Sequence, residues 1–155
     1  MRYFIYLKFK GTAYHGWQVQ PNAHTVQAEV QVALSKILQQ NIEVVAAGRT
    51  DTGVHAEEMV VHFDTGQKWD KRKFIHRMNS LLPKDIAVYD LKQVKDDFHA
   101  RFAALSRTYQ YHLMLKKNPF QHELAYHYHG ALNIDFMNEA TQLLLGEKDF
   151  SCFSK

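Results

Sequence analysis

Residues 48–56 read Gly48-Arg49-Thr50-Asp51-Thr52-Gly53-Val54-His55-Ala56 and lie between two short apolar runs, 42–47 and 59–63. Apolar runs of this length joined by a glycine-containing segment predict two strands with a wide connection between them. Asp51 is the only acid of residues 48–56, with Arg49 two residues before it and a threonine on either side. A guanidinium and hydroxyl groups near a carboxylate favour its charged form, which suits nucleophilic attack. The simpler interpretation is an aspartate that caps its own turn.

The residues on both sides of this hairpin predict an α+β domain. Alternation predicts a strand over 3–10 and another over 86–94. Apolar residues at helical spacing predict a helix that Thr25 caps, and a second helix that starts near Asp70 and stops before Pro83. The resulting β-α-β-β-α-β order is the ferredoxin-like arrangement. The predicted buried stripes are Val26, Val30, Ala33, Leu34, Ile37 and Leu38 on the first helix, and Phe74, Ile75, Met78, Leu81 and Leu82 on the second.

Two surfaces of this domain each carry two interpretations. One face of the first strand is aromatic and basic, with Phe4 and Tyr6 among cationic residues. This face either stacks RNA bases or is covered by another layer of the protein. The second helix carries a basic run over 71–77, which is either a solvated face or a track for RNA phosphates.

The remainder of the chain predicts further elements. Alternation predicts a strand over 107–115. Asn133 or Asp135 opens a third helix, which Gly146 ends. The residues expected to face inward on this helix are Phe136, Ala140, Leu143 and Leu144.

Composition sets broad limits on the protein. The 155 residues carry a formal net charge of +3 and are 46% apolar, which is enough for a packed core. The slight basic excess is compatible with nucleic acid binding and equally with an ordinary soluble surface. Cys152 is the only cysteine, which excludes an internal disulfide framework and suits a reducing compartment. No apolar run approaches membrane-spanning length and no signal peptide opens the sequence, so we expect a cytoplasmic protein with no membrane partner.

Three stretches resemble the TruA family of tRNA pseudouridine synthases. The block over 48–56 resembles the family's signature, with Thr52 where the family usually has alanine. The segment 97–102 and the loop Tyr14-His15-Gly16-Trp17-Gln18 resemble two further stretches of the family. The resemblance implies isomerisation of uridine to pseudouridine in the anticodon stem-loop of tRNA. It implies a homodimer that needs no cofactor and no metal.

The resemblance also assigns roles to residues of this chain. Asp51 would be the catalytic aspartate, which attacks the sugar or the base or helps to abstract a sugar proton. Tyr109 would pack against the target base, and Arg49 would keep Asp51 ionised or fill the space that the flipped base leaves. For Trp17 a packing role is favoured. The candidate RNA contacts are Tyr14, Trp17, Gln18, His55, Arg101 and Arg107.

Members of the TruA family are longer than this chain and consist of two related halves, with the RNA in the cleft between them. The resemblance implies a first domain over 1–97, which carries the catalytic loop, and the start of a second domain over 98–155. We therefore expect a truncated chain with an incomplete second unit and an incomplete site.

Two other functions stay open at this point. One is a non-catalytic RNA-binding module that uses the aromatic and basic sheet face. The other is a metal-dependent hydrolase built on His127 and His129, which would share a strand face. No nearby Cys or Asp adds ligands to these histidines at a familiar spacing, which makes the metal site the weaker alternative.

Overall fold

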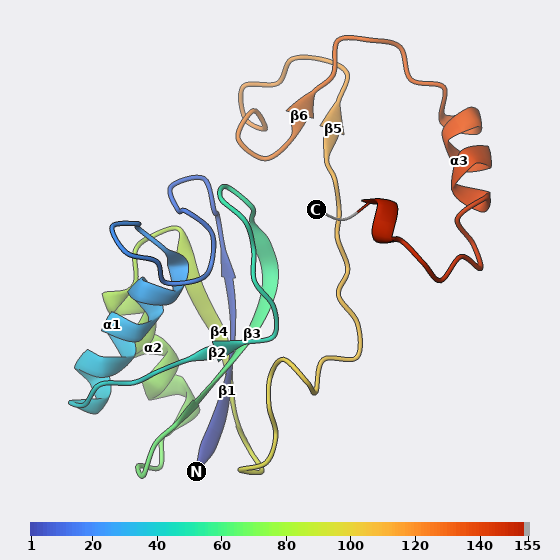
Figure 1. The fold of residues 1–155 in the computed structure, drawn as a ribbon. Coiled ribbons are helices and arrows are strands. Elements are labelled where there is room, and N and C mark those ends of the chain that lie inside the picture. The colour runs from blue at the N-terminus through green and yellow to red at the C-terminus, as the bar shows by residue number, and fades with distance from the viewer. Residues whose placement is uncertain (154–155) are drawn as a thin grey trace. The chain divides into compact units, whose positions relative to one another are not determined.

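The computed structural model describes residues 1–153, and its contacts divide the chain into two compact units, Met1–Thr108 and Tyr109–Lys155 (Figure 1). The last two residues of the predicted second domain, 154–155, lie outside the described residues.

Residues 98–108 belong with the first unit, although the sequence places the start of a second domain at residue 98. Two contacts tie this segment to the sheet. The ring of Phe98 lies 6.5 Å from that of Phe4, and Arg107 Nη2 donates to Ala47 O over 2.7 Å. The division of the chain into a first domain over 1–97 and the start of a second domain over 98–155 stays a prediction.

The first unit is a four-stranded antiparallel sheet with two helices packed on one face (Figure 1). The strand order β2-β3-β1-β4 confirms the predicted ferredoxin-like α+β fold. β2 is shorter than the predicted run 42–47, because only its two residues pair with β3. The elements are β1 (Arg2–Phe9), α1 (Val26–Leu38), β2 (Val45–Ala46), β3 (Ala56–Asp64), α2 (Lys71–Leu81) and β4 (Ile86–Val94).

Both helices start where the sequence predicts. Thr25 caps α1 and Asp70 caps α2, each by accepting a backbone N–H of the first turn, over 3.4 and 2.9 Å. The buried side of α1 is the predicted stripe in full. On α2 the prediction for Leu81 was wrong, since this side chain is 44% exposed. The chain leaves the helix at Leu82, whose extended backbone turns that side chain into the core instead.

The second face of the sheet is covered at Phe4, so the first of its two interpretations fails there. Phe4 is 7% exposed and lies against the rings of His62 and Phe98. Tyr6 stays half-buried, with Lys92 Nζ 4.7 Å from its ring centre. This face therefore keeps one aromatic side chain with a cation beside it and loses the other to packing.

His62 is buried in this covered part of the sheet and is held neutral. Its Nδ1 accepts the backbone N–H of Ala100 over 3.1 Å, and the ring of His99 lies 4.7 Å away. Burial, the Arg2 cation and His99 lower the pKa of His62 to about 4.

We expect the first unit to lose stability as pH falls below about 6.5, the pKa of an unfolded histidine. Because the folded pKa of His62 is lower, its contribution is complete above that pH and is lost as pH falls toward 4. The loss amounts to about 3 kcal/mol, since each pKa unit corresponds to about 1.4 kcal/mol. Urea unfolding at a series of pH values measures it.

The matched variants are His62→Asn and His15→Asn. Asparagine at position 62 offers an acceptor near the place of Nδ1 but does not titrate, so the dependence on pH should flatten. His15 is exposed, and its replacement should leave the dependence as in the parent. A parent-like dependence in His62→Asn would contradict the assignment.

The second unit has short elements, and none of its residues up to 153 is buried. β5 (Leu113–Met114) and β6 (Tyr126–His127) form a parallel pair. The prediction of a strand over 107–115 was wrong outside β5. A strand needs a neighbouring strand to pair with, and only two of these residues pair with one among the described residues.

The third helix, α3 (Ile134–Gln142), starts at the first of the two predicted caps, since Asn133 Oδ1 accepts Phe136 N over 2.9 Å. A short 3₁₀ turn, η1 (Ser151–Phe153), follows. The inward orientation predicted for apolar residues of α3 was wrong. Within the described residues no second layer covers them, so all four are exposed: Phe136, Ala140, Leu143 and Leu144.

Candidate active site

The loop that carries Asp51 (the aspartate loop, residues 48–55) is tied to a second loop from far earlier in the chain (the first loop, residues 11–17). Three hydrogen bonds connect them, and at least one main-chain atom takes part in each. Both loops lie at the same end of the sheet, because Phe9 pairs with Ala56 there. The bonds are Trp17 N to Thr50 O (3.0 Å), Gly53 N to Tyr14 O (3.2 Å) and Gly11 N to His55 Nδ1 (2.9 Å).

Two glycines allow the loops to approach so closely. A Cβ on Gly16 would lie 2.4 Å from Thr50 O, and Gly16 has a φ of +80°, which other residues resist. A Cβ on Gly11 would lie 2.0 Å from Val54 O. Both contacts are with backbone atoms, which no side-chain rotation can move. The path of the aspartate loop is therefore set by glycines outside it.

Helix α1 also helps to hold the first loop in place. One of the residues that do so was not identified from the sequence. The first two amides of α1 donate to the carbonyls of Gly16 and Trp17. The Gln27 side chain accepts Val19 N over 2.9 Å and donates to Val44 O over 3.0 Å, which joins the segment after the first loop to the chain just before β2. The one sequence signal is a polar residue in the first turn of a helix that follows a glycine-containing loop.

Two candidate RNA contacts are packed inside the first unit instead. Tyr14 and Trp17 are each 2% exposed. Trp17 lies against Phe9, at 6.1 Å between ring centroids, which confirms the favoured packing role. The ring of Tyr14 lies 4.7 Å from that of His24, tilted by 40°, and its hydroxyl donates to Asp85 Oδ1 over 2.7 Å. Burial and this hydrogen bond raise the pKa of Tyr14, so the hydroxyl stays a donor.

We expect Tyr14→Phe to destabilise the first unit by about 1–3 kcal/mol, because it removes the donor to Asp85 from a buried site. Tyr89→Phe is the matched control. Tyr89 donates to Glu58 Oε2 over the same 2.7 Å but is 40% exposed, so its loss should cost about 0.5 kcal/mol or less. Chemical denaturation of both variants gives the comparison. Equal losses would show that burial does not decide the strength of the Tyr14 bond.

Asp51 itself is exposed, and within the described residues its carboxylate makes no hydrogen bond and no ion pair. An aspartate that caps its own turn would accept the amides that follow it. Here Gly53 N donates to Tyr14 O, and Val54 N donates to the main-chain carbonyl of Asp51. The simpler interpretation of Asp51, as a turn cap, therefore finds no support in the geometry.

The groups expected to hold the Asp51 carboxylate do not contact it in the part of the chain that the structure describes. Arg49 is exposed and forms no ion pair with Asp51 there. Thr50 Oγ1 is buried and, among the described residues, has no hydrogen-bond partner. What holds Asp51 in place is the backbone of its loop, while its carboxylate stays available to a ligand.

The remaining candidates occupy four settings. Gln18 is exposed beside the first loop. Arg107 lies at the start of the aspartate loop, with Nη2 donating to Ala47 O and to Arg101 O, and Arg101 itself is exposed. Tyr109 opens the second unit and is 78% exposed. His55 Nδ1 is occupied by Gly11 N, as described above.

Residues 1–153 hold neither a candidate metal site nor a membrane-spanning helix. The rings of His127 and His129 lie 4.1 Å apart, but no third His, Cys, Asp or Glu joins them to form a group that could hold a metal ion. Over the same residues, none of the helices has the length and apolarity needed to cross a membrane.

Comparison with known proteins decides the family. The family model described as tRNA pseudouridine synthase matches residues 5–103, which include both loops and all of the sheet except the first three residues of β1. The chain belongs to this family. A tRNA pseudouridine synthase A of Bacteroides thetaiotaomicron is 49% identical over 154 residues, and one of Bacteroides fragilis is 48% identical over 155. One of Aliivibrio salmonicida is 44% identical over 156 residues.

The alignments with these tRNA pseudouridine synthases cover 99% of this chain but only 57%, 62% and 59% of the respective relatives. The chain thus spans about three-fifths of the length of the curated relatives that it matches. The resemblance read from the sequence motifs is confirmed at the level of the family.

Proposed function

We propose that the protein isomerises uridine to pseudouridine in tRNA and that Asp51 is its catalytic group. The observation that carries the proposal is an exposed carboxylate without a partner among residues 1–153, on a loop whose backbone is fixed from outside. An acid with no structural task, held in a defined place, is available for chemistry. Membership of the tRNA pseudouridine synthase family supplies the reaction and the substrate class.

The reaction requires little from the protein except a nucleophile or base and a closed site. The target uridine is flipped from its stack, at a cost of a few kcal/mol. The glycosidic N–C bond breaks, the uracil turns, and a C–C bond forms to the same sugar carbon. The proton on uracil C5 is then lost, and N1, which is no longer bonded to the sugar, takes up a proton. Atoms and electrons balance without an oxidant or a second substrate, so the chemistry needs no cofactor.

Other residues would assist Asp51. We propose that Arg49, which is exposed next to it, fills the space that the flipped base leaves, and that Tyr109 holds the uracil. We further propose that the uridines lie in the anticodon stem-loop, that the complete enzyme is a homodimer, and that it works in the cytoplasm. The aromatic and cationic pair of Tyr6 and Lys92 on the open part of the sheet offers a surface for RNA.

The test is release of tritium from uracil C5 of labelled, unmodified tRNA. We would compare this chain, the Bacteroides thetaiotaomicron relative, and a chimera in which this chain replaces the 154 aligned residues of that relative. Release by the chimera is expected. If the relative is active while neither this chain nor the chimera releases tritium, isomerisation is excluded. Binding of tRNA without release would then favour a non-catalytic RNA-binding module.

A further inference from the structure

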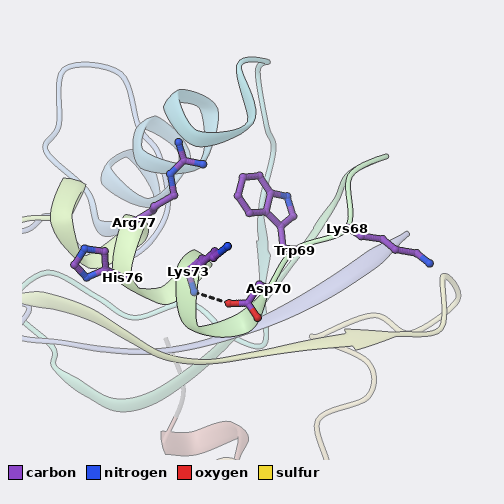
Figure 2. A pocket seen from close by; sticks show the side chains of 6 residues that line it. All are labelled: Lys68, Trp69, Asp70, Lys73, His76 and Arg77. Atoms are coloured by element: carbon purple, nitrogen blue, oxygen red, sulfur yellow. Dashed lines mark hydrogen bonds between the residues drawn. The ribbon is translucent and has the colours of Figure 1, made fainter.

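A pocket of about 470 Å³ lies at the start of α2, on the segment that joins β3 to this helix. Figure 2 shows the six side chains that line it, which are three cations, a tryptophan ring, a histidine and one acid. The proposed reaction uses none of them. They are Lys68, Trp69, Asp70, Lys73, His76 and Arg77.

The cations of this pocket are not neutralised within residues 1–153. Neither Lys68, Lys73 nor Arg77 forms an ion pair there, whereas the nearby Lys71 is paired with Asp90 at 2.5 Å. The pocket's own acid, Asp70, is occupied as the cap of α2, accepting Lys73 N over 2.9 Å. Three cationic residues thus line one pocket with a single carboxylate, although the Lys68 side chain extends away from the other two (Figure 2).

This arrangement is unfavourable for the helix alone. Lys73 and Arg77 are four residues apart on α2, where like charges repel each other. Lys73 also lies in the first turn, where the helix dipole favours negative groups. An anion in the pocket would remove both penalties.

Trp69 gives the pocket a rigid wall. Its ring packs edge-on against Phe74 at 5.6 Å and carries the guanidinium of Arg77 at 5.7 Å from its centre. When a guanidinium lies on an aromatic face, its N–H groups stay in the plane of the guanidinium. They point outward from the ring, where they can donate to an anion. Arg77 is therefore held ready for a phosphate rather than left as a freely moving surface charge.

The pocket and Asp51 lie at opposite ends of β3. The aspartate loop leads into β3 at Ala56, and the pocket segment follows its last residue, Asp64. A nine-residue strand spans roughly 30 Å, since each residue adds about 3.3 Å. Only a large, extended polyanion could occupy both places at once.

From these observations we propose that the pocket at Trp69 binds backbone phosphates of the RNA substrate, at a distance from the reacting uridine. The inference rests on tRNA as the proposed substrate and adds a second contact region to it. Lysine and arginine contacts of this kind position an RNA and carry no sequence information. They also release counterions, so each one adds to the salt dependence of binding.

The experiment is titration of labelled, unmodified tRNA with this chain at several salt concentrations. The pocket pair is Lys73→Gln with Arg77→Gln. The control pair, Lys36→Gln with Arg72→Gln, removes the same charge from exposed positions that do not line the pocket. We expect the pocket pair to weaken binding about tenfold and to lower the slope of log K against log salt by about 2. The control pair should weaken binding by less than about threefold.

Several outcomes would overturn the inference. Equal losses for the two pairs would mean that only overall charge matters, and no measurable binding of tRNA at low salt would exclude the contact altogether. Inorganic phosphate provides the other arm: if it changes the fluorescence of Trp69, judged against Trp69→Phe, while the pocket pair leaves tRNA binding intact, the ligand is a small anion. Melting curves of both pairs exclude unfolding as the cause.

The binding readout separates this inference from the proposed function. Pocket-dependent binding of tRNA without tritium release by the chimera would overturn isomerisation and keep the pocket. Tritium release together with equal binding losses for both pairs would overturn the pocket and keep isomerisation.

Discussion

Asp51→Asn is expected to reduce tritium release by the chimera more than about a thousandfold, the scale on which loss of a single nucleophile acts. The substitution removes the negative charge but keeps the shape of the side chain. Because the Asp51 carboxylate has no partner among the described residues, the fold loses no contact. We therefore expect the melting temperature to stay unchanged and the affinity for tRNA to stay within about threefold.

Asp85→Asn is the matched control for this loss. It also removes one carboxylate from the first unit, but this carboxylate accepts the buried hydroxyl of Tyr14. We expect it to lower stability while most of the tritium release persists. If Asp51→Asn retained turnover near that of the parent, the aspartate would have no part in the chemistry, whatever the family pattern.

Gly16→Ala is expected to destabilise the first unit by about 3 kcal/mol or more. A backbone φ of +80° costs a residue with a Cβ about 1–2 kcal/mol, and the new methyl group would meet Thr50 O at 2.4 Å. The clash is with a main-chain carbonyl, so the aspartate loop must shift and the bond from Trp17 N to Thr50 O is lost. Misplacing a catalytic group by about 1 Å can cost a hundredfold in rate.

Urea unfolding and tritium release, measured on the same preparations, check this result. Gly66→Ala is the control, because a Cβ there meets nothing within 4 Å and its φ is not in the left-handed region. We expect a change within about 0.5 kcal/mol for it. Similar stability of the two variants would mean that the close approach of the loops is not required.

The fold of the first unit could be predicted from its sequence because its signals are local. The caps Thr25 and Asp70, the stripe of α1 and the glycine-containing turn at Asp51 each depend on neighbours within a few residues. The same holds for the strand of β4, whose bounds match the prediction. Local agreement at every element fixed the topology.

The features that the sequence left open or assigned wrongly at these positions depend on partners that local pattern does not report. Phe4 is buried by Phe98, and no residue near position 4 in the sequence indicates this burial. In the sequence Tyr14 looks like an exposed loop residue that could contact RNA. Its hydroxyl instead donates to Asp85, which is 71 residues away in the sequence. Arg49 is two residues from Asp51, but closeness in sequence did not place the side chains in contact. Burial and pairing are tertiary properties, and periodicity does not report them.

The connection between the two loops also limits how such a site can change. Because main-chain atoms hold the loops together over as many as 44 residues of sequence, an inserted or deleted residue in either loop would shift every bond at once. Exposed side chains of and beside these loops take no part in these three hydrogen bonds. Substrate preference at this site can thus change by substitution but not by insertion. The exposed positions at which substitutions fit include Thr12, His15, Gln18 and Thr52.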